Sequence, residues 1–274
     1  MKIINWNDIV SSGRDFFQGQ KTGITIGTFD GVHAGHKTLI DMCVSYSKLQ
    51  NLIPLAVTFR FPPKKSLSPL DYPGEILPFD CKINLLDKLG IRQVLVIDFS
   101  SEFGRMSGED FVEILRNSLH FNYLAAGYDF RFGRSMESGV PELKIMAEKY
   151  HFVLEVASPV TVGGERVSSS LIRCKIRGGE LGIVRRLLGR PFCIYLQNAA
   201  FSREQGKLKY ALGQIKQVLP PAGEYKVSLS CGGENINPLL ATGDGLTGNC
   251  RIDSGFLVLE DFDLDSNPCC ISFI

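Results

Sequence analysis

Hydrophobic residues in the first two thirds of the chain fall into short continuous runs that alternate with segments of helical periodicity. The runs expected to form strands are Gly23–Gly27, Ile53–Phe59, Val94–Ile97, Tyr123–Tyr128 and Phe152–Ala157. Runs that are apolar along their whole length are typical of a parallel sheet buried on both faces.

Between these runs, Lys37–Leu49, Lys82–Leu89 and Gly108–Leu119 place their apolar residues on one helical face. Strands that alternate with helices predict an α/β fold with a doubly wound parallel sheet. Ligands of such sheets bind at the carboxyl ends of the strands.

The pattern changes after Pro191. Helical periodicity fades, and turn-rich pieces separate the candidate strands Leu208–Val218, Gly223–Leu229 and Gly255–Leu259. The sequence therefore predicts two domains: an α/β domain over residues 1–192 and a small all-β domain over residues 193–274.

Composition narrows the class of protein. The chain has 274 residues and a formal net charge of +1, which argues against a dedicated nucleic-acid binder. No stretch reaches the roughly 20 apolar residues that cross a membrane, and the N-terminus turns polar too early for a secretory signal. We expect a cytoplasmic globular protein without a membrane or nucleic-acid partner.

The 8 cysteines show no CxxC spacing, so a zinc knuckle or a redox dithiol is not indicated. We expect them to be thiols, mostly buried, and we predict no protein-bound metal.

The densest motif is GTFDGVHAGH, which runs from Gly27 to His36 between the first strand and the first helix. Its glycines, Gly35 among them, permit a sharp turn and close approach of a ligand. The start of the following helix directs backbone N–H groups and a positive dipole end towards a bound anion. No lysine of the P-loop type follows.

His33 and His36 are three residues apart, so both imidazoles can face one ligand. Imidazoles beside phosphate oxygens donate hydrogen bonds and stabilise charge during phosphoryl or nucleotidyl transfer. A zinc site is an alternative but lacks an obvious third ligand, and generic packing of the two side chains is another.

Two later segments carry further candidates. Ser168, Ser169 and Ser170 can cap a helix or hold phosphate, and Arg173 follows one turn later. In GYDFRFG, Asp129 can hydrogen-bond a ribose or an amine, whereas a core position is expected for Phe130. Most of the other basic residues near Arg173 are expected at solvated helix positions: Lys175, Arg177, Arg185, Arg186 and Arg190.

Together these segments resemble a known family. GTFDGVHAGH is similar to the signature of the prokaryotic FAD synthetases, members of the HxGH nucleotidyltransferase superfamily. GYDFRFG (127–133), VSSSLIR (167–173) and LLGRPF (187–192) resemble three further family motifs in the same order, with Ser170 where threonine is usual. The resemblance covers about residues 15–192. It implies a Rossmann-like doubly wound sheet followed by a β-barrel.

The resemblance also implies a reaction: FMN and ATP give FAD and pyrophosphate, with Mg²⁺ as cofactor. His33 and His36 would hold the ATP phosphates, and Arg173, Ser169 and Ser170 would lie beside the leaving pyrophosphate. The remaining residues that it assigns to the ATP site are Gly27, Thr28, Phe29, Asp30, Gly35 and Asp129. Phe59 and Phe132 would face the flavin.

Two departures from the family pattern matter. The strand that usually reads TFxPHP here reads TFRFPP from Thr58 to Pro63, so the flavin side of the site is expected to differ. The riboflavin kinase module that usually follows carries a PTAN motif, absent here, and a catalytic glutamate whose place Phe256 takes. We therefore expect a reduced β-barrel without kinase activity.

Two alternatives stay open from the sequence. One is an enzyme of the same superfamily with a different phosphate acceptor, and the other is a non-catalytic flavin or nucleotide carrier. Oligomeric state and protein partners are not predicted.

Overall fold

Two compact units make up the chain in the computed structural model. The structure describes residues 1–11, 16–62, 71–100, 102–197, 199–231, 246–253, 255–260, 262 and 268–274. Unit 1 consists of Met1–Phe29, Gly35–Tyr72 and Leu86–Val160. Unit 2 consists of Asp30–Ala34, Pro73–Leu85 and Thr161–Ile274.

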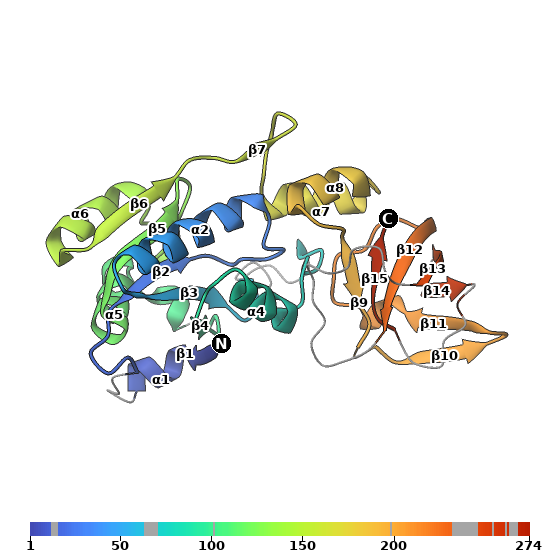
Figure 1. The fold of residues 1–274 in the computed structure, drawn as a ribbon, viewed down its shortest axis with the longest axis horizontal. Helices are drawn as coiled ribbons and strands as arrows, with labels where there is room; N and C mark the ends of the chain where they lie inside the picture. Colours follow the sequence, from blue (N-terminus) through green and yellow to red (C-terminus); the bar gives the residue numbers. More distant parts are fainter. Residues whose placement is uncertain are drawn as a thin grey trace. The chain divides into compact units, whose positions relative to one another are not determined.

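Unit 1 contains a six-stranded sheet in the order β1-β4-β3-β2-β5-β6, and every pairing in it is parallel (Figure 1). Its strands are β1 (Lys2–Asn5), β2 (Thr22–Ile26), β3 (Ile53–Phe59), β4 (Gln93–Ile97), β5 (Phe121–Gly127) and β6 (Val153–Ala157). The central strands are buried almost throughout, as continuous apolar runs require. The predicted parallel α/β fold is confirmed.

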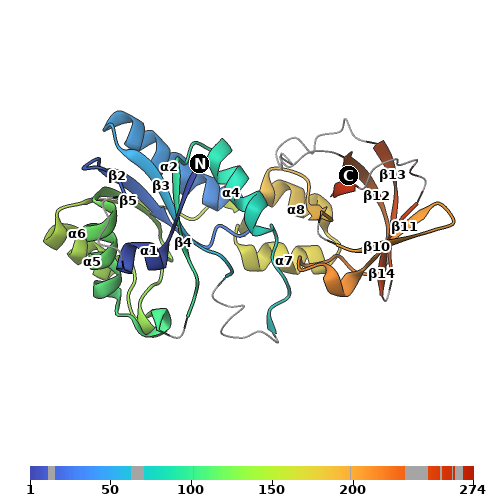
Figure 2. The ribbon, with the colours of Figure 1, turned by 90° about the horizontal axis from the view of Figure 1, so that it is seen from below.

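Helices cover both faces of this sheet (Figure 2). On one face lie α1 (Trp6–Ser11), α5 (Gly108–Leu119) and α6 (Val140–Tyr150), and α2 (Ala34–Leu49) covers the other. Before β6 the described residues also form the helix α4 (Phe79–Lys88), whose first residues belong to unit 2, and the short 3-10 helices η2 (Phe103–Arg105) and η3 (Arg134–Met136).

Apolar stripes on the helices meet the sheet on both sides. The core under α1, α5 and α6 includes Trp6, Phe111 and Leu115, packed in one cluster with Leu55 and Leu124 of the strands. On the face under α2, the Cys43 thiol donates to the Gly23 carbonyl at 3.1 Å, and Tyr46 stacks on Tyr123 with ring centroids 4.0 Å apart. Helices therefore pack against the central strands from both sides.

Unit 2 contains a seven-stranded antiparallel sheet in the order β10-β11-β14-β13-β12-β15-β9, and this sheet curls (Figure 1). Its strands are β9 (Cys193–Tyr195), β10 (Phe201–Glu204), β11 (Lys207–Ala211), β12 (Gly223–Cys231), β13 (Leu246–Ile252), β14 (Phe256–Glu260) and β15 (Pro268–Phe273). The predicted strand Leu208–Val218 was wrong in its second half, where the 3-10 helix η4 (Leu212–Gln214) follows β11.

The C-terminal stretch of unit 2, Thr161–Ile274, begins with a hairpin and two helices. These are β7 (Thr161–Val162), β8 (Glu165–Arg166), α7 (Ser169–Arg177) and α8 (Leu181–Leu188). Cys43, Cys81, Cys193, Cys250 and Cys270 are buried thiols, as predicted, whereas Cys174 is exposed. Over the described residues, none of the helices has both the length and the apolar character needed to cross a membrane.

Leu55→Ala tests the core of unit 1. Leu55 is 0% exposed in the middle of β3, so its truncation is expected to lower the free energy of unfolding by about 2–5 kcal/mol. Urea denaturation followed through the fluorescence of Trp6, the single tryptophan, reports on this core. Leu49→Ala on α2, at a side chain 81% exposed, is the matched control and should change stability by less than about 0.5 kcal/mol.

Candidate active site

The segment Gly27–His36 connects the end of β2 to α2. Its first residues are fixed to β3, because the Gly27 N–H donates to the Val57 carbonyl at 3.0 Å and the Thr58 hydroxyl donates to the Thr28 carbonyl at 3.1 Å. The turn therefore starts at the carboxyl end of the sheet, where α/β proteins bind ligands.

The backbone of this turn adopts left-handed conformations at Phe29, Gly31 and Val32, with φ of 48°, 81° and 41°. At Gly31 a Cβ atom would also lie 3.0 Å from Ile76 Cγ2. A β-branched residue such as Val32 rarely adopts this conformation, and such strain costs on the order of 1–3 kcal/mol and persists only where surrounding contacts fix it.

Arg190, which lies far from this turn in the sequence, supplies such contacts. Its side chain is buried, and Nη2 donates to the Gly31 carbonyl at 2.7 Å, while Nη1 reaches the Val32 carbonyl at 3.4 Å. Arg190 is the exception to the solvated helix positions expected for most of the basic residues, because α8 ends at Leu188 and Gly189 caps it with φ of 66°. The Gly-Arg-Pro sequence after the helix was the available signal.

His33 follows this turn and is 6% exposed. Burial lowers the pKa of its imidazole, and together with the positive charges of Arg190 and Arg173 it brings that pKa to about 4. The imidazole is therefore uncharged at neutral pH, and the positive charge around it is carried by the two guanidinium groups.

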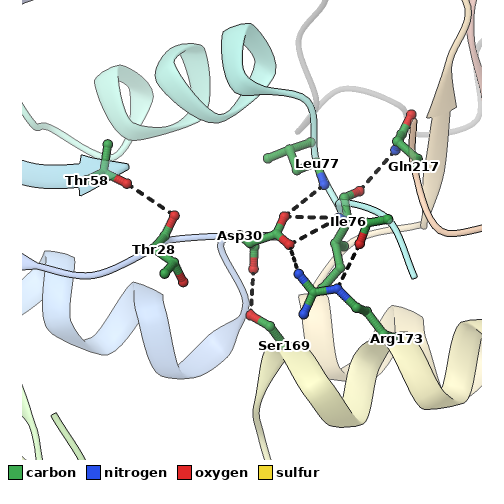
Figure 3. Close-up of polar contacts among 9 residues, drawn as sticks. Thr28, Asp30, Thr58, Ile76, Leu77, Ser169, Arg173 and Gln217 are labelled. Carbon is green, nitrogen blue, oxygen red and sulfur yellow. Dashed lines mark hydrogen bonds and ion pairs between the residues drawn. The ribbon is translucent and has the colours of Figure 1, made fainter. Parts of the chain in front are cut away.

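Asp30 and Arg173 form a buried ion pair in unit 2 (Figure 3). The Arg173 Nη2 contacts the Asp30 carboxylate, and Arg173 Nε donates to the Gly74 carbonyl at 2.9 Å. The carboxylate also accepts from the backbone N–H of Ile76 at 3.0 Å and of Leu77 at 3.2 Å. Burial raises the pKa of Asp30, and Arg173 and these two N–H groups oppose that effect.

Sequence reasoning missed the segment Gly74–Leu77, which we call the strap. It supplies only backbone groups to this cluster: the Gly74 carbonyl and the N–H groups of Ile76 and Leu77. Because every residue type except proline carries such groups, the sequence held no signal for them beyond the glycine itself.

The serines at the start of α7 make different contacts. Ser168 is the N-cap and accepts from the Leu171 N–H at 3.2 Å. Ser169 instead donates to the Asp30 carbonyl at 3.0 Å, which ties α7 to the turn (Figure 3). Ser170 is exposed.

The other predicted ATP-site residues lie near the carboxyl ends of strands in unit 1. The Phe29 ring and the His36 imidazole meet in a T-shaped arrangement with centroids 5.3 Å apart, and Gly35 lies in the first turn of α2. Asp129 is exposed in the turn that follows β5.

Phe59 and Phe132, predicted to face the flavin, belong to one aromatic cluster. Phe59 meets Phe103 at 5.9 Å, Phe103 meets Phe111 at 5.8 Å, and Phe111 meets Phe132 at 6.2 Å between centroids. Phe132 is 7% exposed and stacks on Phe130, so its ring contributes to the core.

The described residues contain no group of three or more His, Cys, Asp and Glu side chains that could hold a metal ion. A zinc site formed by His33 and His36 with a third such ligand is therefore not found in this part of the chain.

The parallel sheet and the glycine turn at its carboxyl end define an α/β protein of the nucleotide-binding type. The family model described as FAD synthetase matches residues 17–171. The chain therefore belongs to the FAD synthetase family.

Individual relatives agree with this assignment. The bifunctional riboflavin kinase/FMN adenylyltransferase of Buchnera aphidicola subsp. Schizaphis graminum is 30% identical over 215 residues, which cover 77% of this chain and 69% of the relative. The protein of the same name from Haemophilus influenzae is 28% identical, over 90% of this chain and 82% of the relative. The FAD synthetase of Listeria monocytogenes is 29% identical, over 74% of this chain and 79% of the relative. This chain is an FMN adenylyltransferase, a nucleotidyltransferase of FAD biosynthesis.

One solved structure matches both units. The structure titled macrolide-efflux protein from Streptococcus pneumoniae superimposes with a TM-score of 0.79 at 20% identity, over 100% of this chain and 89% of that chain. At this identity the likeness concerns the fold alone, and it supports the α/β sheet followed by a smaller β domain.

The pKa of His33 leads to a pH-dependent stability. Between pH 6.5 and about 4 the unfolded chain binds a proton at His33 that the folded chain does not, so stability falls as pH falls. From pH 7.5 to 5 this loss is about 2 kcal/mol, and His33→Asn should abolish it in urea denaturation followed by circular dichroism. His151→Asn, at an exposed histidine, is the control. An unchanged pH dependence in His33→Asn would contradict the assignment.

Proposed function

We propose that the turn Gly27–His36 and the start of α7 bind ATP and direct the transfer of AMP to the phosphate of FMN. The observation that carries this proposal is the set of buried charges in unit 2: Asp30 and Gly74 fix the guanidinium of Arg173, and Arg173 and Arg190 place positive charge around His33. Fixed guanidinium groups suit the binding of a polyphosphate.

In this reaction an FMN phosphate oxygen attacks the α-phosphorus of ATP. A new bond joins the two phosphates, and the bond from the α-phosphorus to the bridging oxygen breaks as pyrophosphate leaves. No protein nucleophile takes part, so catalysis consists of positioning and electrostatic stabilisation.

The side chains act on the phosphates in different ways. His33 and His36 donate hydrogen bonds to ATP phosphate oxygens, and for this His33 does not need to be charged. Arg173, with Ser169 and Ser170, stabilises the negative charge that develops on the leaving pyrophosphate. Gly27, Thr28, Phe29, Asp30, Gly35 and Asp129 form the remainder of the ATP site.

Mg²⁺ belongs to the substrate in this proposal, since it binds ATP phosphates and keeps several of its waters. The two Asp30 oxygens accept from Ile76 and Leu77 and contact Arg173, so we assign Asp30 to positioning and name no protein ligand. We place the reaction in the cytoplasm, where thiols such as Cys43 stay reduced.

On the flavin side we assign Phe59 and Phe132. Phe59 belongs to the segment TFRFPP, which departs from the family pattern. In it Arg60, just after β3, pairs with Asp98 at 3.1 Å, and Phe61 is 39% exposed. Pro63 lies outside the described residues. We propose further that residues 1–192 form the transferase domain, and that residues 193–274 form a β domain without riboflavin kinase activity.

His36→Ala tests the assignment of the motif. With one hydrogen-bond donor to the phosphates removed, FAD formation from FMN and ATP should fall by about 10²–10³-fold, measured as pyrophosphate release. The unfolding transition should stay close to that of the wild type. His151→Ala is the matched control and should retain full activity. Near-normal turnover of His36→Ala would contradict the proposed role.

A second assay addresses the β domain. Purified wild-type protein is expected to convert FMN to FAD and to form no FMN from riboflavin and ATP, because Phe256 stands where the family's catalytic glutamate would be. Chromatography of the flavins distinguishes the products. Sustained FMN formation would overturn the proposed loss of kinase activity, and pyrophosphate release with a phosphomonoester other than FMN would favour a different acceptor. Flavin binding without any pyrophosphate release would indicate a carrier.

A further inference from the structure

The strap Gly74–Leu77 lies between the ion pair of Asp30 and Arg173 and a segment of the C-terminal part of the chain. On one side it contacts Arg173 through the Gly74 carbonyl and Asp30 through the N–H groups of Ile76 and Leu77. On its other side it contacts Lys216–Val218, which precedes β12. Both sets of contacts lie within unit 2.

Backbone hydrogen bonds join the strap to this second segment. The Glu75 N–H donates to the Lys216 carbonyl at 3.2 Å, and the Val218 N–H donates to the Glu75 carbonyl at 2.9 Å. Glu75 and Gln217 thus form a parallel β-bridge outside the two large sheets.

Gly74 shows how closely the two backbones approach. Its φ is 113°, and a Cβ atom at this position would lie 2.5 Å from the Val218 nitrogen and 2.7 Å from the Gln217 carbonyl carbon. A side chain here would push the strap away from Gln217, so only glycine allows this contact.

The side chain of Gln217 adds a third connection. It is 5% exposed, and its Nε2 donates to the Ile76 carbonyl at 3.0 Å and to the Cys193 carbonyl at 2.9 Å. Its Oε1 accepts from the Tyr195 N–H at 2.8 Å. One amide therefore links the strap to β9, and Ile76 bonds to Gln217 through its carbonyl and to Asp30 through its N–H (Figure 3).

We propose that Gln217 is a positioning residue for adenylyl transfer, which holds the strap so that Ile76, Leu77 and Gly74 orient Asp30 and Arg173. This inference rests on the role proposed above for Arg173. It gives the β domain a part in the transferase reaction that requires no kinase chemistry: the domain acts through Gln217 and the backbone of Lys216–Val218.

The expected effect follows from the geometry. Loss of the Gln217 amide leaves the buried Ile76 carbonyl without this donor, which is unfavourable, and the strap can shift by a fraction of an ångström. Because a displacement of about 1 Å costs roughly 10²-fold in rate, a smaller shift of Arg173 is expected to lower kcat by about 10-fold. The KM for FMN should stay within twofold of that of the wild type. Gln217 acts on Arg173, which we assign to stabilising the leaving pyrophosphate and not to binding FMN.

Gln217→Met, which keeps the length of the side chain and removes its polar groups, is the main test. The matched control is Gln214→Met in the same unit, at a residue whose Oε1 accepts from the Ala200 N–H at 2.8 Å. Thermal unfolding checks that both variants fold. If Gln217→Met does not fold, the test uses Gln217→Glu instead, which keeps an acceptor for the Tyr195 N–H. We expect the 10-fold loss of kcat at Gln217 and less than a twofold change at Gln214.

A double-mutant cycle with Arg173→Lys separates positioning from a general loss of structure. If Gln217 acts through Arg173, the double variant should lose less activity than the product of the two single losses, whereas independent effects multiply. A kcat of the Gln217 variant within twofold of that of the wild type, or multiplicative losses, would overturn the inference.

The same measurements distinguish this inference from the proposed function. Wild-type protein that makes no FAD, or an Arg173→Lys variant with full activity, would refute the proposed function itself. Reduced activity in Arg173→Lys together with normal activity in the Gln217 variant would refute only the role of Gln217.

Discussion

The burial of the Asp30 carboxylate is the constraint on which the candidate site depends. The side chain of Asp30 is 4% exposed and that of Arg173 12% exposed, so charge on either residue is stable only with a partner in place. Removing one member of such a pair typically costs about 3–5 kcal/mol. The groups that meet this need come from residues 74–77 and from α7, and they hold together segments that are far apart in the sequence.

The same constraint accounts for the strained turn after β2. Asp30 is fixed through its carboxylate and, by Ser169, through its carbonyl, and Arg190 holds the carbonyls of Gly31 and Val32. With both sides of the turn fixed, Val32 can keep its left-handed conformation. His33 follows directly, so its place depends on contacts made by its neighbours.

Much of the fold could be predicted from the sequence because burial on both faces of a parallel sheet leaves continuous apolar runs. The edge strand β1 was missed, since Lys2–Asn5 is largely exposed and has no such run. The candidate site was predictable only in part. Histidines, serines and Arg173 stand out by residue type, whereas the strap acts through backbone groups. The burial of Arg190 was not predicted, because the charge of a basic residue favours solvent. Burial of a charged side chain by distant segments is a tertiary property that local patterns do not contain.

These contacts also bear on why a β domain without kinase chemistry would keep its fold. A domain that served only as a remnant would need no specific contact with the transferase residues. Gln217 instead satisfies two carbonyls and one N–H in a buried position, and each of these groups would be left without a donor or acceptor if the segment moved. The strap contacts Asp30 on one side and pairs with Lys216–Val218 on the other. If Lys216–Val218 moved, the strap would lose this pairing, and Asp30 and Arg173 would be held less firmly. On this view the β domain contributes to adenylyl transfer by fixing a backbone segment, and that contribution is independent of any reaction of its own.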